Sequence, residues 1–464
     1  MLNLDIKKIT EYSGGELFLP AGKSVEDYAD LKASCVVQDS RVVGENGVFL
    51  AIKGEKVDGH KFIPQVFEGG ALAVICEDLP EEITGPCVKV ENTVKALQNL
   101  ATGYRKQLDV KVVGVTGSVG KTSTKEIVAS VLEQKYKVLK TEKNFNNLIG
   151  LPLMVLKITE DIEVAVLEMS ISEFGEMEVL SSIARPDVCL ITNIGQCHLE
   201  NLKDRDGVLA AKTRVYDYMN RDGFVVFNGK DDKLLTVTDV YGNAPLFFGE
   251  NGQAAYATNV SSKGLLGSKF TVNLNIDNTI SFEAQVPLPG AHMISNALAA
   301  SIIGYKLGLT TDEIAKGINC VQAVGGRSNI IKTNKYVLID DCYNANPVSM
   351  KAAIDLLKQA DGRKVAILGD MFELGVNEKE LHKEVGEYAA SQGIEVITCV
   401  GDLSLNMRDG ALSALMCEKQ EINYCKEKSD LLRRLPNILE EGDTILIKAS
   451  HGMGFDEIVK ILSE

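Results

Sequence analysis

The residues best suited to chemistry lie in a glycine-rich stretch, VVGVTGSVGKTST. Gly114, Gly117 and Gly120 give the backbone room to turn successive N–H groups toward a phosphate. Lys121 is placed to reach the terminal phosphates of a nucleotide, and Thr122 to hold Mg²⁺ through its hydroxyl. The spacing departs from the common G-x-x-x-x-G-K-[ST] pattern, because Gly114 is one residue too far from Gly120 and Gly117 is two residues too near.

The flanking sequence predicts a strand before these glycines and a helix after them. Four of the five residues 110–114 are apolar or glycine, and an apolar stripe at helical spacing follows the loop. A helix that begins directly after a glycine turn favours an anion at its first turn. A plain strand-to-helix turn is the alternative. We expect a nucleotide phosphate loop made of Gly117, Ser118, Val119, Gly120, Lys121, Thr122 and Ser123.

Further polar groups follow apolar strands in the middle of the chain. They are three asparagines in TEKNFNNLIGLPL, Glu168 at the end of EVAVLE, His198 after PDVCLITNIGQC, and Lys212 among small residues on a predicted helix. Ligands of open α/β sheets bind at the carboxyl ends of the strands, so these groups could converge on the phosphates. The alternatives are a paired carboxylate at a strand end for Glu168 and a structural histidine for His198.

Composition narrows the class of protein. A chain of 464 residues predicts about three domains. The net charge of −15 argues against nucleic acid or an anionic membrane as a general partner. Ten scattered cysteines without a C-x-x-C pair predict reduced thiols, and the absence of a long apolar run or a signal peptide predicts a cytoplasmic protein. We expect a monomer.

Taken together, these motifs resemble the Mur ligases of peptidoglycan synthesis, most closely the branch that adds D-alanyl-D-alanine. The resemblance covers essentially the whole chain. Its motifs are DSR and KGEKVDGHKF near the start, TGSVGKTSTKE, NFNNLIGLPL, EM, ITNIGQCHLE and AK in the middle, and DDCYNANPVSM with LGDMFELG near the end. YNANP and LGDM-ELG are particular to that branch, whereas GKT-ST would also fit a folylpolyglutamate synthetase.

The resemblance implies an α/β protein of three domains. Residues 1–107 would form a small α/β domain that binds the UDP end of the substrate, and residues 108–325 a central P-loop ATPase domain with a mainly parallel sheet. Residues 326–464 would form a Rossmann-like, doubly wound domain. The implied reaction is ATP-dependent amide synthesis, in which UDP-N-acetylmuramoyl-tripeptide is activated as an acyl phosphate and D-alanyl-D-alanine displaces the phosphate.

The resemblance also implies roles for single residues. Lys121 and Thr122 would hold the ATP phosphates with one Mg²⁺, and Glu168 and His198 would bind a second. The lysine that matches Lys212 is typically carbamylated in this family. Lys121, Lys212 and His198 are therefore the catalytic candidates. Asn296, Arg327 and Asp341 match positions that hold adenine, phosphate and ribose; Ser40 and Arg41 match the uridine-nucleotide site; and Asn144, Asn146, Asn147, Tyr343, Asn344 and Asn346 are further substrate-binding candidates.

The chain departs from the family pattern at several positions. Met293 replaces an asparagine, Lys203 a glycine, Arg214 a glutamate and Ala449 a glycine, while Ser328 and Asn329 replace an apolar and acidic pair. These changes leave the amine substrate open. A paralogous ligase that joins a different amino acid or dipeptide to a carboxylate is the first alternative. A nucleotide-binding homologue that has lost turnover is the second, and the presence of Lys121, Glu168 and His198 argues against it.

Overall fold

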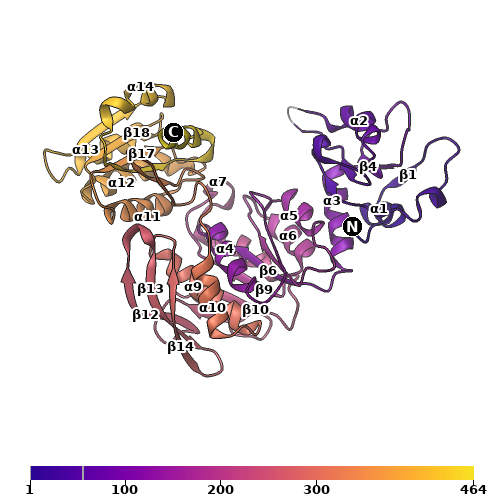
Figure 1. The fold of residues 1–464 in the computed structure, drawn as a ribbon, viewed down its shortest axis with the longest axis horizontal. Coiled ribbons are helices and arrows are strands. Elements are labelled where there is room, and N and C mark those ends of the chain that lie inside the picture. The colour runs from indigo at the N-terminus through magenta and orange to yellow at the C-terminus, as the bar shows by residue number, and fades with distance from the viewer. Residues whose placement is uncertain (1, 55–56) are drawn as a thin grey trace.

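The computed structural model describes residues 2–54 and 57–464, which form three lobes, each built on one β-sheet (Figure 1). Residues 55 and 56, in the KGEKVDGHKF motif, lie outside the described residues. In residues 2–54 and 57–464, no helix is both long and apolar enough to cross a membrane. The expected three-part α/β architecture is confirmed.

The first lobe has a five-stranded sheet in the order β1-β5-β4-β3-β2, parallel except for the antiparallel edge strand β1. Its strands are β1 Glu16–Phe18, β2 Val36–Val37, β3 Val48–Leu50, β4 Ala73–Cys76 and β5 Cys87–Lys89. Its helices are α1 Ile6–Ser13, α2 Ile63–Glu68 and α3 Thr93–Arg105. Helix α3 leads into the central lobe and packs against its helices α5 and α6.

The central lobe has a nine-stranded sheet in the order β14-β13-β12-β11-β10-β9-β6-β8-β7. The strands from β7 to β12 pair in parallel, and β12, β13 and β14 form an antiparallel meander. The strands are β6 Lys111–Thr116, β7 Val138–Lys140, β8 Val164–Glu168, β9 Val188–Ile191, β10 Phe224–Asn228, β11 Leu246–Phe248, β12 Ala255–Ser262, β13 Ser268–Asn275 and β14 Thr279–Val286. The helices are α4 Lys121–Leu132, α5 Gly150–Val155, α6 Glu176–Ala184, α7 Leu199–Leu202, α8 Arg205–Thr213, α9 His292–Lys306 and α10 Thr311–Cys320.

Helices cover both faces of the parallel part of this sheet. Val113 and Val115 of β6 pack in one apolar cluster with α4, α9 and α10, whereas Val112 packs in another with α3, α5 and α6. Successive side chains of a strand point to opposite faces, so a strand covered on both sides is apolar throughout. The polar residues Thr116 and Glu168, which end β6 and β8, and Thr192, which follows β9, therefore mark the carboxyl end of the parallel strands, and the site lies there.

The last lobe has a six-stranded sheet in the order β15-β16-β20-β17-β18-β19, parallel except for β15. Its strands are β15 Asn329–Lys332, β16 Val337–Asp340, β17 Lys364–Gly369, β18 Val396–Val400, β19 Glu421–Cys425 and β20 Thr444–Lys448. Its helices are α11 Pro347–Lys358, α12 Glu378–Ser391, α13 Ser404–Ser413, α14 Lys428–Ile438 and α15 Asp456–Ser463. Each sheet lies within one of the expected domains, and the boundaries near residues 107 and 325 stay predictions.

Candidate active site

The glycine-rich turn between β6 and α4 has the shape of a phosphate loop. Gly117 has φ 146° and Gly120 has φ 82°, conformations that residues with a side chain rarely adopt. A Cβ atom on Gly117 would lie 2.0 Å from Thr192 Oγ1, so the close approach of this loop to the end of β9 also requires glycine. The free N–H groups of the first turn of α4 point out of the helix toward this turn.

The residues that follow β9 brace the loop from the side. Asn193 Oδ1 accepts from the Val119 N–H at 3.0 Å, and Asn193 Nδ2 donates to the Val119 carbonyl at 2.9 Å. The Thr192 hydroxyl donates to the same carbonyl at 2.6 Å. Because both groups of Val119 are held by side chains, the loop is fixed before any ligand arrives, which lowers the ordering cost of binding.

Lys121 and Glu168 place opposite charges beside this loop. Lys121 Nζ donates to the Gly117 carbonyl at 2.8 Å and to the Ser118 carbonyl at 3.3 Å, so the ammonium lies over the loop. Burial lowers the pKa of Lys121, and the nearby Glu168 carboxylate offsets part of this effect. Glu168 in turn accepts from Thr122 Oγ1 and from Asn146 Nδ2, each at 2.8 Å.

His198 joins the central lobe to the last lobe. Its Nδ1 lies 2.7 Å from Glu373 Oε2, and in the part of the chain that the structure describes this is the one ion-pair contact between residues 108–325 and 326–464. Both residues have positive φ, 50° for His198 and 62° for Glu373, which is unusual for residues with side chains. Burial lowers the pKa of His198 and Glu373 offsets part of this effect, which favours a neutral ring with its proton on Nδ1 and a free Nε2 lone pair.

Lys212 on α8 is a buried cation, 1% exposed. Among the described residues its ammonium has no hydrogen-bond or ion-pair partner, unlike Lys125, which is equally buried but donates to the Thr141 carbonyl at 2.6 Å and contacts Glu126 at 2.9 Å. Burial lowers the pKa of Lys212 to about 8, and the positive charge of Lys121 adds to this effect. The arrangement makes the neutral amine accessible at physiological pH.

The last lobe supplies the opposite wall. Arg327 stacks on the Tyr343 ring with its Cζ atom 4.1 Å from the ring centroid, and within the described residues its buried Nε atom has no acceptor. Asp341 accepts from the Ser328 N–H at 2.9 Å and from Lys448 Nζ at 2.7 Å. A planar cation with an unused donor next to a fixed carboxylate suits the phosphate and ribose of a nucleotide.

These groups line one cavity of about 580 Å³ between the central and last lobes. Among the site residues expected from sequence, its walls include Ser118, Val119, Gly120, Lys121, Ser123, Asn144, Asn146, Asn147, Glu168, His198, Asn296, Arg327, Asp341, Tyr343, Asn344 and Asn346. Gly117, Thr122 and Lys212 are not on the cavity surface, although Thr122 bonds to Glu168 at its wall. Ser40 and Arg41 lie in the first lobe, outside this cavity, where Arg41 pairs with Asp39 at 2.7 Å.

Two of the expected substrate-binding asparagines also have structural roles. Asn346 Oδ1 caps helix α11 by accepting from the Ser349 N–H at 2.9 Å, and Asn147 Oδ1 accepts from the Gly150 N–H at 2.9 Å at the start of α5. Caps of this kind typically contribute about 1 kcal/mol to stability. The donor groups of both amides remain available to a ligand.

The departures from the family pattern have local explanations. Arg214 is held by Glu178 at 3.3 Å and by Asp217 at 3.2 Å, so its guanidinium is already paired with two carboxylates. Lys203 ends α7 with φ 71°, a conformation that glycine adopts without strain and lysine does not.

Met293 and Ala449 fill apolar space. Met293 is buried, and its Sδ accepts from Asn296 Nδ2 at 3.7 Å. Ala449 is buried, and its Cβ would lie 2.7 Å from a Cβ on Gly369, so glycine at 369 makes room for it. Neither departure removes a group from the phosphate loop.

The donor set suits magnesium that is brought in by a nucleotide. Mg²⁺ prefers oxygen ligands and is usually bound by one or two carboxylates together with substrate phosphates. Thr122 and Glu168 supply such oxygens beside the phosphate loop, at 2.8 Å from each other. In residues 2–54 and 57–464 no group of three or more His, Cys, Asp or Glu side chains forms a protein-only metal site. The residues therefore fit Mg²⁺ only when phosphates or another anion complete its shell.

Comparison with known proteins decides the family. Sequence models of the Mur ligase family match three consecutive parts of the chain: the catalytic domain at residues 32–113, the middle domain at 115–304 and the glutamate ligase domain at 326–451. This chain belongs to the Mur ligase family.

Individual Mur ligases match over their full length. The chain is 38% identical to the UDP-N-acetylmuramoyl-tripeptide–D-alanyl-D-alanine ligase of Bacillus subtilis (strain 168), over 100% of this chain and 99% of that protein. It is 33% identical to the Escherichia coli (strain K12) enzyme of the same name, with the same coverage. A crystal structure of MurF from Acinetobacter baumannii superimposes with a TM-score of 0.88 at 29% identity, covering 99% of this chain and 98% of that one. MurF ligase from Thermotoga maritima in complex with ADP gives 0.81 at 29% identity, over 94% and 98%.

Two features of this Mur ligase site were not expected from its sequence. Glu373 belongs to the LGDMFELG motif, but no pattern in the sequence pairs it with His198. The bonds from Asn193 to both sides of Val119 were likewise unforeseen, although Asn193 follows a predicted strand. For Asn193 the available signal was a polar residue just after a buried parallel strand, whereas Glu373 lies four residues beyond the end of β17 and carried no such signal.

Proposed function

We propose that this Mur ligase adds D-alanyl-D-alanine to UDP-N-acetylmuramoyl-tripeptide with hydrolysis of ATP to ADP and phosphate. The observation that carries the proposal is the single cavity in which the phosphate loop, Lys121 and Glu168 face Arg327 and Asp341 of the last lobe. The proposal is supported by full-length relatives whose names state this reaction. Because one chain supplies both walls of the cavity, a monomer suffices as the functional unit.

The reaction joins a carboxylate to an amine in two steps. The terminal carboxylate of the peptide attacks the γ-phosphorus of ATP, and ADP leaves, which gives an acyl phosphate. The dipeptide amine then attacks the carbonyl carbon, loses a proton, and phosphate leaves with the former carboxylate oxygen. Both steps depend on alignment and charge neutralisation rather than on a protein nucleophile.

In this proposal the phosphate loop and Lys121 would hold the β and γ phosphates, and Thr122 would hold one Mg²⁺. Glu168 and His198, the latter through its free Nε2, would hold a second Mg²⁺ near the terminal carboxylate of the peptide. Asn296 contacts adenine, while Arg327 and Asp341 bind phosphate and ribose. When bound, the metal ions supply Lewis acidity that neutralises the charge on the transferring phosphoryl group.

We also propose that Lys212 is carbamylated. Its neutral amine adds CO₂ to give a carbamate and a proton, which replaces an unpartnered buried cation with an anion. With a pKa of about 8, roughly a tenth of the amine is neutral at pH 7, compared with less than about a thousandth for an ordinary lysine. The carbamate would provide an anionic oxygen for the coordination shell of the second Mg²⁺ ion, which the protein carboxylates leave incomplete.

The remaining proposals concern the residues that bind the uridine nucleotide, the peptide and the dipeptide, and the extents of the three domains. We propose that Ser40 and Arg41 bind the uridine nucleotide in a first domain of residues 1–107. The central domain would span residues 108–325 and the last domain 326–464. Asn144, Asn146, Asn147, Tyr343, Asn344 and Asn346 would then contact the peptide and the incoming dipeptide across the cavity.

A phosphate-release assay with a panel of amines tests the proposal. Purified protein is given ATP, Mg²⁺ and UDP-N-acetylmuramoyl-tripeptide, with D-alanyl-D-alanine, single D-amino acids or L-amino acids as the amine. Among these amines, we expect D-alanyl-D-alanine to be the one that gives phosphate release. Release with another amine only would identify a paralogous ligase, and release with none would indicate a homologue without turnover.

A further inference from the structure

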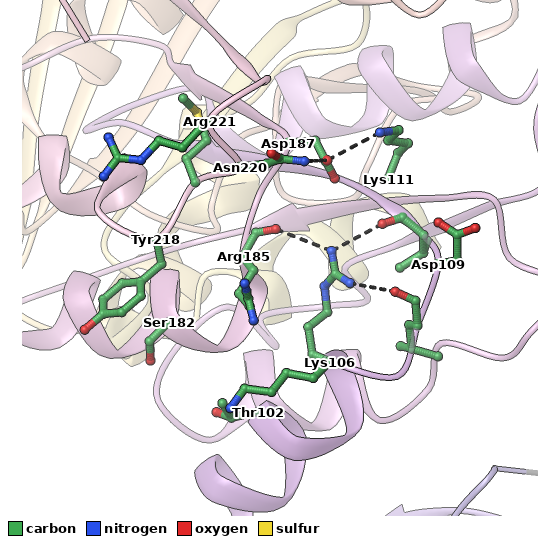
Figure 2. Close-up of a pocket in the computed structure, with 14 residues that line it drawn as sticks. Thr102, Lys106, Asp109, Lys111, Ser182, Arg185, Asp187, Tyr218, Asn220 and Arg221 are labelled. Atoms are coloured by element: carbon green, nitrogen blue, oxygen red, sulfur yellow. Dashed lines mark hydrogen bonds and ion pairs between the residues drawn. The ribbon is translucent and has the colours of Figure 1, made fainter. Parts of the chain in front are cut away.

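A second cavity, of about 870 Å³, lies at the amino end of the parallel strands of the central sheet, whereas the phosphate loop lies at their carboxyl end. It is lined by the end of α3, by the start of β6, and by the segments that lead into β9 and β10 (Figure 2). None of its lining residues also lines the candidate active site. We call it the basic cavity.

The basic cavity concentrates positive charge in an acidic protein. Five cations line it against two carboxylates, whereas the whole chain carries a net charge of −15. The carboxylate of Asp187 is already engaged, because it accepts from the Val112 N–H at 2.8 Å and from Asn220 Nδ2 at 3.1 Å. Asp187 Oδ1 also lies 3.6 Å from Lys111 Nζ, so these two charges pair. The other carboxylate, Asp109, is exposed.

Arg105 forms a buried, charged wall of the cavity. It is 8% exposed, and its guanidinium donates only to backbone carbonyls, those of Ala184 at 2.9 Å, Leu108 at 3.1 Å, Val110 at 3.2 Å and Arg185 at 3.4 Å. Among the described residues it contacts no carboxylate. Burial lowers the pKa of Arg105; the nearby charges of Asp187 and Asp109 offset part of this effect, and the charge of Arg185 adds to it.

Besides Arg105, three cations of this cavity have no acidic partner among the described residues: Arg221, which stacks on the Tyr241 ring with its Cζ atom 3.6 Å from the centroid, and the free side chains of Arg185 and Lys106. Neither of these two free side chains has a hydrogen-bond or ion-pair partner within residues 2–54 and 57–464. Arg185 ends α6 with φ 46°, a strained conformation that directs the chain sharply into β9. Figure 2 shows Arg185 and Lys106 on the side of the cavity with Ser182 and Tyr218, away from Lys111 and Asp187.

We propose that the basic cavity is a binding site for a phosphate-bearing anion, held by Arg185 and Lys106 in front of Arg105. A guanidinium matches two phosphate oxygens at once, and an ammonium adds a point charge. Three cations that make no direct ion pair with a carboxylate of the described residues favour a ligand with two or more negative charges over a single carboxylate. The Ser182 hydroxyl and the Tyr218 phenol lie in the same lining and provide neutral hydrogen-bonding groups.

The test uses the full-length protein saturated with ADP in the absence of Mg²⁺, so that the phosphate loop is occupied and pyrophosphate stays free. Inorganic pyrophosphate is titrated by calorimetry, and sedimentation with vesicles of phosphatidylglycerol or of phosphatidylcholine alone distinguishes a lipid headgroup from a soluble phosphate. The variant is Arg185→Gln with Lys106→Gln. The matched control is Lys332→Gln with Lys335→Gln, which removes two exposed charges from the last lobe.

We expect pyrophosphate or phosphatidylglycerol vesicles to bind the wild type and the control, and binding to weaken at least about tenfold in the Arg185 and Lys106 variant. Binding of pyrophosphate alone would assign a soluble ligand, and binding of the anionic vesicles alone a lipid headgroup. Absence of binding to the wild type, or equal binding by the variant, would overturn the proposal. If the double variant fails to fold, Lys106→Glu provides the same comparison with one exposed side chain changed.

Discussion

Replacing Glu373 should weaken the proposed second Mg²⁺ site, although Glu373 lies on a different lobe from the expected ligands Glu168 and His198. A histidine that binds a metal usually donates its second ring N–H to a carboxylate, which fixes its tautomer and orientation. Glu373 Oε2 is 2.7 Å from His198 Nδ1, so it is placed to hold Nε2 toward the metal. The loop that carries Glu373 is itself anchored, because the Met371 N–H donates to His382 Nε2 at 2.9 Å and the Phe372 N–H donates to Ser450 Oγ at 2.9 Å.

The size of the effect follows from exposure. The His198 ring is neutral, so Glu373 acts as the acceptor of the Nδ1 proton and not as the partner of a cation. The Glu373 side chain is 64% exposed, so water competes for this contact and weakens it. Loss of a carboxylate behind a metal-binding histidine typically costs 10- to 100-fold in metal affinity. We therefore expect the lower end, about tenfold or about 1.4 kcal/mol, for Glu373→Ala.

The assay is Mn²⁺ binding followed by electron paramagnetic resonance, in the presence of ADP and the UDP-linked peptide, with turnover measured in parallel. Glu373→Gln keeps an acceptor for the Nδ1 proton and should lose less affinity than Glu373→Ala. Glu380→Gln, an exposed glutamate in the first turn of α12, is the control. Unchanged Mn²⁺ affinity in a folded Glu373→Ala protein would refute the positioning role.

Three further outcomes are expected. Lys121→Ala should lower turnover by at least about 100-fold, because it removes a preorganised charge from the transferring phosphoryl group, and near-normal phosphate release would contradict the phosphate-loop assignment. Lys212→Ala should be inactive and should regain activity when acetate fills the vacated space as a substitute anion; full activity without acetate would argue against the carbamate. The last lobe should close on the central lobe when ATP and the UDP-linked peptide bind together, because both lobes line the cavity. Small-angle X-ray scattering should then show a smaller radius of gyration than that of the free protein. An unchanged radius with both ligands present would count against closure.

Local patterns in the sequence were sufficient to predict the strand, glycine turn and helix of the proposed phosphate loop. The apolar run before Gly114 and the helical stripe after Lys121 predicted strand, turn and helix, which the structure has as β6, the glycine turn and α4. The exact start of a helix is harder to read from the sequence. Helix α2 begins at Ile63, because the preceding residues Gly59–Phe62 form a 3₁₀ turn capped by Asp58.

Contacts between distant segments were not predictable from the sequence. His198 and Glu373 are separated by more than a hundred residues and meet only because the lobes pack together. Arg214 stands where the family pattern has a glutamate, and nothing in the sequence indicates that Glu178 on α6 holds it. Such pairings depend on which face of each helix is buried, and a charged residue carries no signal of its partner.

The origin of the oxygen in the released phosphate tests the central claim most directly. The UDP-linked tripeptide is prepared with ¹⁸O in its terminal carboxylate and ligated to D-alanyl-D-alanine with unlabelled ATP. An acyl phosphate intermediate predicts that one ¹⁸O atom appears in each inorganic phosphate, together with ADP and a product that has gained the dipeptide. Unlabelled phosphate, or label found in AMP, would contradict it.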